Sequence, residues 1–313
     1  MDLYVRSGPI HGYHGSGGNA LRLLTNLHPA VVLVYIVSLL GVVMFTRHPL
    51  VIALALMGSV LFLVAAVGMQ AAGKVLGLSF LLILLVTLTN PLFMHRGVTP
   101  LFVIFGKVAT LESLLYGGVS GAMLAAVILW FKGIGTVMTS DKFLYLFGRI
   151  FPKLSLILSM SFRFIPLFAR QIRGVYQVQK TMGMYDSRAI SDRFLGGARV
   201  FSAVLTWALE NAIDTANSMR ARGYGIPGRT SFSLFAFGKT DGIALIVALI
   251  LGTSAALGAW SGALDFTYYP AVSAPEPELA DLAVWILIGV MMLLPAMIEI
   301  ADRMLWNLYR SRM

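Results

Sequence analysis

Six long runs of apolar residues constrain this chain more than any other feature of its sequence. Each run is close to the ~20 residues that an α-helix needs to cross about 30 Å of hydrocarbon. Within hydrocarbon every backbone N–H and C=O must find a partner inside the protein, so such runs favour helices. The sequence therefore predicts an integral membrane protein of the all-α class, a polytopic helical bundle. The six runs are residues 30–45, 49–67, 76–92, 111–131, 242–260 and 282–298.

Composition supports this class and argues against catalysis or ion pumping by the chain itself. Hydrophobic residues make up 58% of the chain and charged residues 12%, with a mean hydropathy of +0.82. These values are too apolar for an average soluble domain. None of the six runs has an Asp, Glu, Lys, Arg or His near its middle, which proton relays and ion-coupled pumps normally need. With no Cys, no H-E-x-x-H and no G-x-S-x-G, we expect a non-enzymatic protein without a catalytic residue, metal site or cofactor.

The positive charge is concentrated in one central block. Residues 161–240 contain eleven Lys or Arg against four acids, whereas residues 261–281 contain four acids and no Lys or Arg. The positive-inside rule then places the central block in the cytoplasm, with four spans before it and two after it, and both termini on the cytoplasmic side. We read the high charge as orientation and attraction to anionic lipid, not as nucleic-acid binding. The predicted parts are a loose tail (1–27), a bundle (28–152), a cytoplasmic module (153–240) and a membrane hairpin with a basic tail (241–313).

The cytoplasmic module is predicted to contain long amphipathic helices. Residues 154–168 include Arg163 and Pro166, so a kinked helix at the membrane surface fits better than a crossing. After a turn at Gly196-Gly197, a helix over residues 195–222 would be roughly 42 Å long. Its predicted apolar face comprises Phe201, Val204, Leu205, Ala208, Leu209, Ala212, Ala216 and Met219.

Several glycine patterns have alternative interpretations. An ordinary helix ending would by itself explain the pattern of Arg220, Arg222, Gly223 and Pro227. Residues 223–228 fit G-x-G-x-x-G, but glycines that end a helix do not fit a dinucleotide fingerprint, which lies between a strand and a helix. Gly238-Lys239-Thr240 lacks the earlier glycine of a phosphate-binding loop. The small residues 117–121 favour close packing inside the bundle over contact with a partner.

Three segments resemble one transporter family: Asn90-Pro91-Leu92-Phe93, residues 207–211 (Trp-Ala-Leu-Glu-Asn) and, above all, residues 218–225 (Ser-Met-Arg-Ala-Arg-Gly-Tyr-Gly). The chain is similar to the transmembrane T component of energy-coupling factor (ECF) transporters. The resemblance spans roughly residues 28–241. It implies a non-catalytic membrane scaffold in the cell membrane that joins two ABC-type ATPases, or one fused ATPase, to a membrane S component. ATP hydrolysis on the partners would then drive uptake of a B vitamin, cobalt or nickel.

In that family two Arg-centred triplets each dock into one ATPase. Ala221-Arg222-Gly223, preceded by Arg220, matches the second triplet in full, while the first corresponds to Thr181-Met182-Gly183, preceded by Lys180, and lacks the central Arg. Either Lys180 or Arg173 supplies the charge there, or the contact is apolar, because Met cannot form the forked hydrogen bonds of a guanidinium. The alternative function is a stand-alone permease or channel whose basic block binds anionic lipid.

Overall fold

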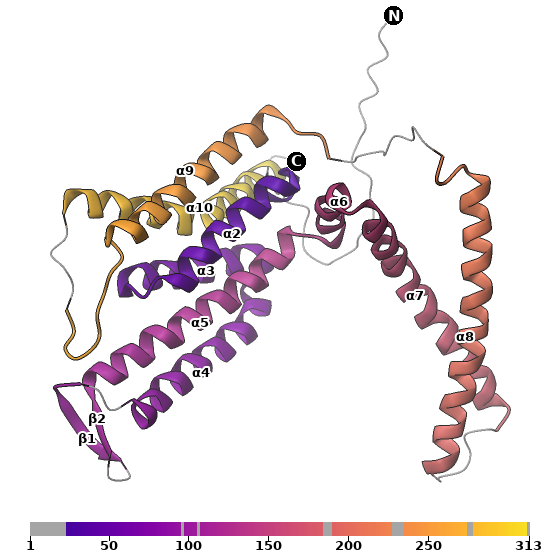
Figure 1. Cartoon of the computed structure of the whole chain (residues 1–313), viewed down its shortest axis with the longest axis horizontal. Coiled ribbons are helices and arrows are strands. Elements are labelled where there is room, and N and C mark those ends of the chain that lie inside the picture. The colour runs from indigo at the N-terminus through magenta and orange to yellow at the C-terminus, as the bar shows by residue number, and fades with distance from the viewer. Residues whose placement is uncertain are drawn as a thin grey trace, which may run out of the picture. The chain divides into compact units, whose positions relative to one another are not determined.

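The computed structural model describes residues 23–94, 97–104, 107–183, 190–226, 235–273 and 278–311, and nearly all of them are helical (Figure 1). The chain divides into two compact units. The first, here called the bundle, comprises the chain up to Met138 and from Phe237 onward, and the second, the hairpin unit, comprises Thr139 to Ala236. The hairpin unit thus includes α6 (Ser140–Ile150), which the sequence-based boundaries assign to the membrane bundle.

The bundle consists of membrane-length helices and one short sheet. Five helices of the described residues are long and apolar enough to span a membrane, not six. The remaining predicted run forms α2, which at 17 residues lies at the lower limit of the usual ~17–25 for a span. The elements are α1 (Leu23–Asn26), α2 (Pro29–Phe45), α3 (Pro49–Val67), α4 (Met69–Phe93), β1 (Pro100–Ile104), β2 (Lys107–Thr110), α5 (Leu111–Val137), α9 (Lys239–Ser261) and α10 (Leu279–Arg310).

The core of the bundle lies where α3 packs against α5 and α10. Trp130 is buried and donates a hydrogen bond from its indole N–H to the Ala55 carbonyl oxygen at 3.2 Å. Gly58 allows the backbones of α3 and α10 to approach, because an added Cβ would lie 2.3 Å from the Met292 carbonyl oxygen. This satisfied indole and this close approach fix α3 at the centre.

Small residues on α5 pack inside the bundle, as the sequence predicts. A Cβ added at Gly117 would lie 2.8 Å from Asn90 Cβ, and one added at Gly121 would lie 3.0 Å from the Ile83 carbonyl oxygen, both on α4. Substitution at either position would force α4 and α5 apart. The opposite side of α4 presents a row of exposed leucines suited to lipid: Leu78, Leu81, Leu85 and Leu88.

Contacts at two places tie the bundle's loops together. The Tyr268 hydroxyl donates to the Arg47 carbonyl oxygen at 2.7 Å, which joins the loop after α2 to the loop after α9. Elsewhere the His28 N–H donates to Asp241 Oδ1 at 2.8 Å, which joins the starts of α2 and α9. α2 and α9 therefore run side by side in the same direction. The antiparallel β1–β2 sheet between α4 and α5 is an element that the sequence analysis did not predict.

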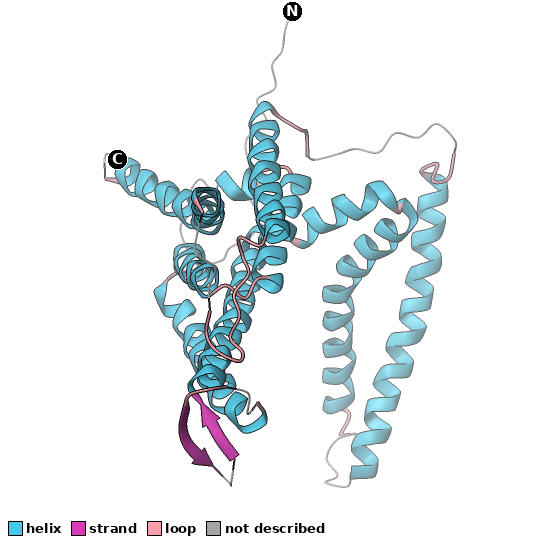
Figure 2. Cartoon of the chain, turned by 60° about the vertical axis from the view of Figure 1, so that its left-hand side comes forward, coloured by secondary structure: helices cyan, strands magenta, loops and turns pink. Residues whose placement is uncertain are grey.

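In the hairpin unit, α7 (Pro152–Thr181) and α8 (Ile190–Ala221) lie side by side and antiparallel (Figure 2). The predicted turn at Gly196-Gly197 is wrong, because α8 begins at Ile190 and passes through both glycines. Gly196 is buried, and a Cβ added at Gly197 would meet open space. Pro166 likewise lies within a single helix, α7.

Candidate functional site

Aromatic contacts fix the register between α7 and α8. The Phe168 ring meets the Trp207 ring edge-on at a centroid distance of 5.8 Å and stacks on Phe164 at 5.8 Å. Val200 and Val204 are buried on the same face of α8. Since the helices are antiparallel, this register brings the carboxyl end of α8 beside the first half of α7 and leaves the carboxyl end of α7 at the other end of the pair.

The carboxyl end of α8 is closed by its own backbone. The Tyr224 N–H donates to the Met219 carbonyl oxygen at 3.0 Å, and the Gly223 N–H donates to the Arg220 carbonyl oxygen at 3.0 Å. Gly223 has φ +75, a left-handed conformation that favours glycine. This pair of hydrogen bonds is a Schellman motif. The Met219 and Arg220 carbonyls therefore have backbone partners, and the motif closes the helix without the Arg222 side chain.

The carboxyl end of α7 has closely similar geometry. Its last helical residue is Thr181, and the Gly183 N–H donates to the Lys180 carbonyl oxygen at 3.1 Å. Gly183 has φ +77. The Met182 side chain is 67% exposed although it is apolar. Thr181-Met182-Gly183 and Ala221-Arg222-Gly223 thus occupy equivalent positions, each after a basic residue and each ending in a left-handed glycine.

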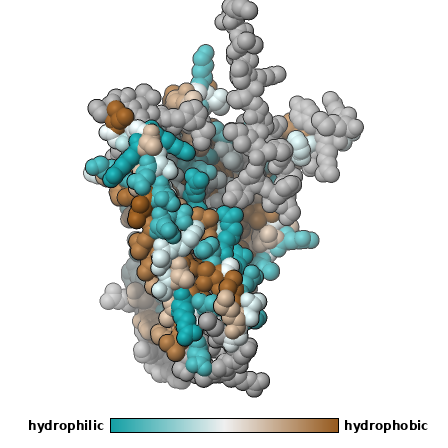
Figure 3. Space-filling view, turned by 90° about the vertical axis from the view of Figure 1, so that its right-hand side faces the viewer, coloured by the Kyte–Doolittle hydropathy of each residue, from teal (hydrophilic) through white to brown (hydrophobic). Residues whose placement is uncertain are grey.

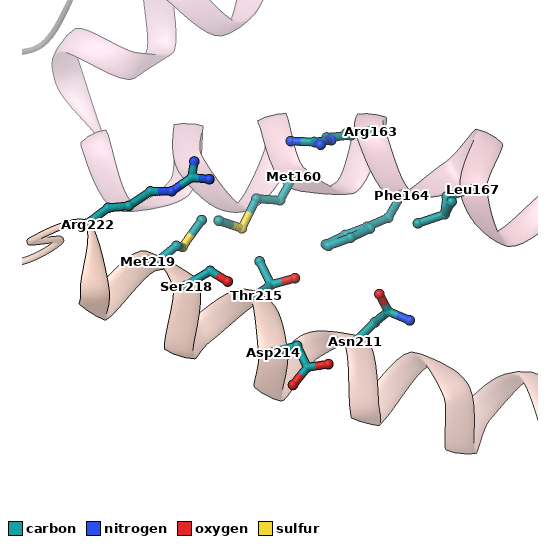
Figure 4. Close-up of a pocket in the computed structure, with 10 residues that line it drawn as sticks. All are labelled: Met160, Arg163, Phe164, Leu167, Asn211, Asp214, Thr215, Ser218, Met219 and Arg222. Carbon is teal, nitrogen blue, oxygen red and sulfur yellow. The ribbon is translucent and has the colours of Figure 1, made fainter.

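An open groove of about 360 Å³ lies between the first half of α7 and the second half of α8 (Figure 4). Its two cations are Arg163 and Arg222, one from each helix. The sequence analysis used Arg163 as an argument against a membrane crossing and as part of the basic block, but did not identify it as a candidate site residue. The other lining residues are Met160, Phe164, Leu167, Asn211, Asp214, Thr215, Ser218 and Met219.

The outer side of α8 carries a second surface. Phe201, Leu205 and Leu209 are 69%, 48% and 60% exposed, and Ile213 continues the row at 63%. The single apolar face predicted for this helix is therefore wrong, because Val204 packs inward while these four residues face outward. In the view of Figure 3, brown apolar residues lie exposed among teal hydrophilic ones. We call these four residues the α8 outer row.

Neither nucleotide pattern has the structural context that nucleotide binding requires. Gly223 and Gly225 follow a helix, and Pro227 and Gly228 of the same pattern lie outside the described residues. Gly238 is the N-cap of α9, and its N–H donates a hydrogen bond to Asp241 Oδ2 at 2.9 Å. Over the described ranges, no three His, Asp or Glu side chains gather as a metal site would require.

Comparison with known proteins identifies relatives of the chain. No protein-family model matches it. It is 29% identical over 185 residues to the energy-coupling factor transporter transmembrane protein EcfT of Listeria innocua, covering 54% of this chain and 68% of the relative. It is 28% identical over 247 residues to EcfT of Bacillus selenitireducens, covering 73% of this chain and 90% of the relative. The prediction from the motifs is confirmed: the chain is a homologue of the transmembrane T components of energy-coupling factor transporters.

Proposed function

We propose that the chain is the scaffold and coupling subunit of an ECF-type, ATP-driven importer. One observation carries the proposal: two equivalent helix ends, one with Arg222 and one with Met182, lie at opposite ends of a single antiparallel helix pair. Thr181 lies 18 residues beyond Arg163, which faces the Arg222 end, so the two ends are about 27 Å apart along α7. That separation suits two ATPase subunits, or two domains of one fused ATPase, held side by side.

The proposed mechanism is mechanical. α8 has 32 residues and is about 48 Å long, and we propose that the edge-on contact between the Phe168 and Trp207 rings couples the motion of α7 to that of α8. A displacement of either helix end by an ATPase would thus reach the α8 outer row. We propose that this row contacts the S component, because exposed Phe, Leu and Ile side chains of this density favour burial against another protein. ATP hydrolysis then takes place on the partners, and the chain itself is non-catalytic.

Purification of the complex from its native membrane tests this function. A tagged chain should bring with it ABC-type ATPase subunits and a small membrane protein, and mass spectrometry of the bound small molecule should identify a B vitamin, cobalt or nickel. Vesicles containing the full complex should take up that molecule only with ATP. Uptake by vesicles that contain this chain alone would instead support a stand-alone permease or channel, whose basic residues bind anionic lipid.

Orientation gives an independent test. We propose that the hairpin unit and both termini face the cytoplasm, because eleven Lys or Arg against four acids occupy residues 161–240. A cysteine introduced at Ser273 should react with an impermeant reagent from outside the cell, whereas one at Thr181 should react only after the membrane is opened. The reverse pattern would make ATPase docking from the cytoplasm impossible.

A further inference from the structure

We propose that the groove between α7 and α8 receives a partner segment that presents a carboxylate beside an apolar side chain, and that Arg163 is a second arginine of this docking site. The inference rests on the proposed function, since the segment is assigned to the ATPase bound at the α8 end. It goes further by placing part of the contact on α7, some 60 residues earlier in the chain than Arg222.

The groove has two chemically distinct parts. Arg163 and Arg222 extend over the same end of it, from helices that approach from opposite sides (Figure 4). Met160 and Met219 lie between them, and Phe164 and Leu167 continue the apolar surface along α7. A ligand that fills this groove must therefore offer negative charge at one end and apolar surface along the rest.

The charge is uncompensated in the isolated chain. Within the described residues, no acidic side chain forms a salt bridge with either guanidinium by the usual 4.0 Å distance. Asp214 is the one acid among the residues that line the groove, and its carboxylate points away from both arginines in Figure 4. The carbonyl oxygens of Ser218, Met219 and Arg220 accept from backbone N–H groups, so they do not occupy the Arg222 side chain either. Two like charges on one groove repel, and a carboxylate bound between them would relieve that repulsion.

The apolar part favours a protein segment over a lipid headgroup or free phosphate. A phosphate would satisfy the arginines but would leave Met160, Phe164, Leu167 and Met219 uncovered. A volume of about 360 Å³ is at the small end of the range of ~300–1,000 Å³ for ligand pockets and suits a few side chains. Helices that lie in apolar grooves with a charged contact fixing their register are a common recognition mode.

Site-specific photocrosslinking in the full complex tests the occupant. A benzophenone amino acid at Ser218, inside the groove, should crosslink to an ATPase peptide that contains Asp or Glu. The same probe at Thr206, which lies outside the groove, is the control. Crosslinks from Ser218 to lipid or to the S component alone would overturn the proposal.

Arg163→Gln tests the second arginine, with Arg170→Gln as the matched control. Arg170 is exposed on the same helix, seven residues further on, and does not line the groove. Arg163→Gln should weaken ATPase binding by about ten- to a hundredfold, the usual effect of losing a charged hydrogen bond, while Arg170→Gln changes it little. If Arg163→Gln retains the ATPase while Arg222→Ala loses it, this inference fails and the proposed function stands. If both variants retain it, docking of an ATPase at the Arg222 end fails as well, and the scaffold function is then decided by co-purification and uptake with the unaltered chain.

Discussion

The carboxyl ends of α7 and α8 share one backbone design but differ in the residue at its centre. In both, the last helical residue is followed by an exposed residue and then by a glycine with φ of +77 or +75. In both, the N–H of the central residue donates to a carbonyl four residues earlier at 3.1 Å. The central residue is Met182 at one end and Arg222 at the other. The two helix ends thus share their backbone shape, but only the end with Arg222 has a charge at the central position.

This difference separates two roles of a helix end that the sequence alone does not distinguish: closing the helix and contacting a partner. A left-handed glycine after a helix satisfies the helix's last carbonyls, whatever side chain precedes it. The side chain before the glycine is then free to contact a partner, and Met182 and Arg222 suit different partner surfaces: an apolar pocket and a cluster of acceptors. We infer that the two helix ends bind two different ATPase surfaces. Four predictions test this comparison.

The largest effect is expected from Arg222→Ala. Removing a guanidinium that is buried against acceptors in the complex should cost about 2–5 kcal/mol of docking free energy, much of it from partner groups left unpaired. ATPase recovery with the tagged chain and substrate uptake should both fall steeply. The thermal stability of the purified chain should not change, because the α8 cap consists of backbone hydrogen bonds. Normal ATPase recovery and uptake would restore the interpretation of Arg222 as part of an ordinary helix ending.

Substitutions of Met182 probe the other end and should have a smaller effect. If its exposed side chain is buried by an ATPase, Met182→Ala should weaken that contact by at most about 3 kcal/mol, the value for a fully buried side chain. Met182→Arg discriminates between partner surfaces. It should strengthen docking if the partner offers acceptors, and disrupt it if the pocket is apolar, because a charge would then be buried unpaired. The affinity of each variant for purified ATPase reports the outcome.

Alanine at the two glycines tests whether the backbone design is equivalent. A non-glycine residue in the left-handed conformation costs about 1–2 kcal/mol, so Gly183→Ala and Gly223→Ala should fray their helix ends to a similar extent. Gly174→Ala, inside α7 with open space around it, is the control and should slightly stabilise the helix. Hydrogen exchange of the amides at each helix end measures the fraying. Faster hydrogen exchange at one helix end only would show that the two ends are not equivalent.

Much of the fold was accessible from the sequence because hydrocarbon permits few structures. Runs such as 49–67 and 111–131 form α3 and α5, and the packing of Gly117 against α4 followed from its small size. The Gly196-Gly197 turn was wrong because glycine's low helix propensity is only a weak preference, which the surrounding structure overrides in α8. The β1–β2 sheet was missed because its residues directly precede α5, where apolar character alone does not distinguish strand from helix.

The candidate site was accessible only in part. The triplet around Arg222 could be located from one chain, since Arg and Gly after a long amphipathic run mark a helix end. Thr181-Met182-Gly183 lacks the Arg and was located only through the family resemblance. The groove could not be located from the sequence, because it depends on the register set by Phe168 and Trp207, which brings Arg163 beside the Arg222 end. Periodicity along α8 also failed to separate the inward Val204 from the outward Leu205, because adjacent positions differ by only about 100° around the helix.

Salt should have the smallest of the four effects, a difference in salt sensitivity between ATPase binding at the two helix ends. The electrostatic screening length falls from about 10 Å at 0.1 M salt to about 3 Å at 1 M, so an Arg222 contact with exposed edges should weaken as salt rises. A contact made by burying Met182 should tolerate salt, because it depends on apolar area removed from water. The measurement is the ATPase released from the immobilised complex as the salt concentration is raised in steps. The ATPase at the Arg222 end should be released first. In Arg222→Ala the two ends should no longer differ in salt sensitivity. Equal salt sensitivity at both ends, together with a neutral Met182→Asp, would show that Thr181-Met182-Gly183 is only a helix ending of matching shape and that one ATPase position is held in another way.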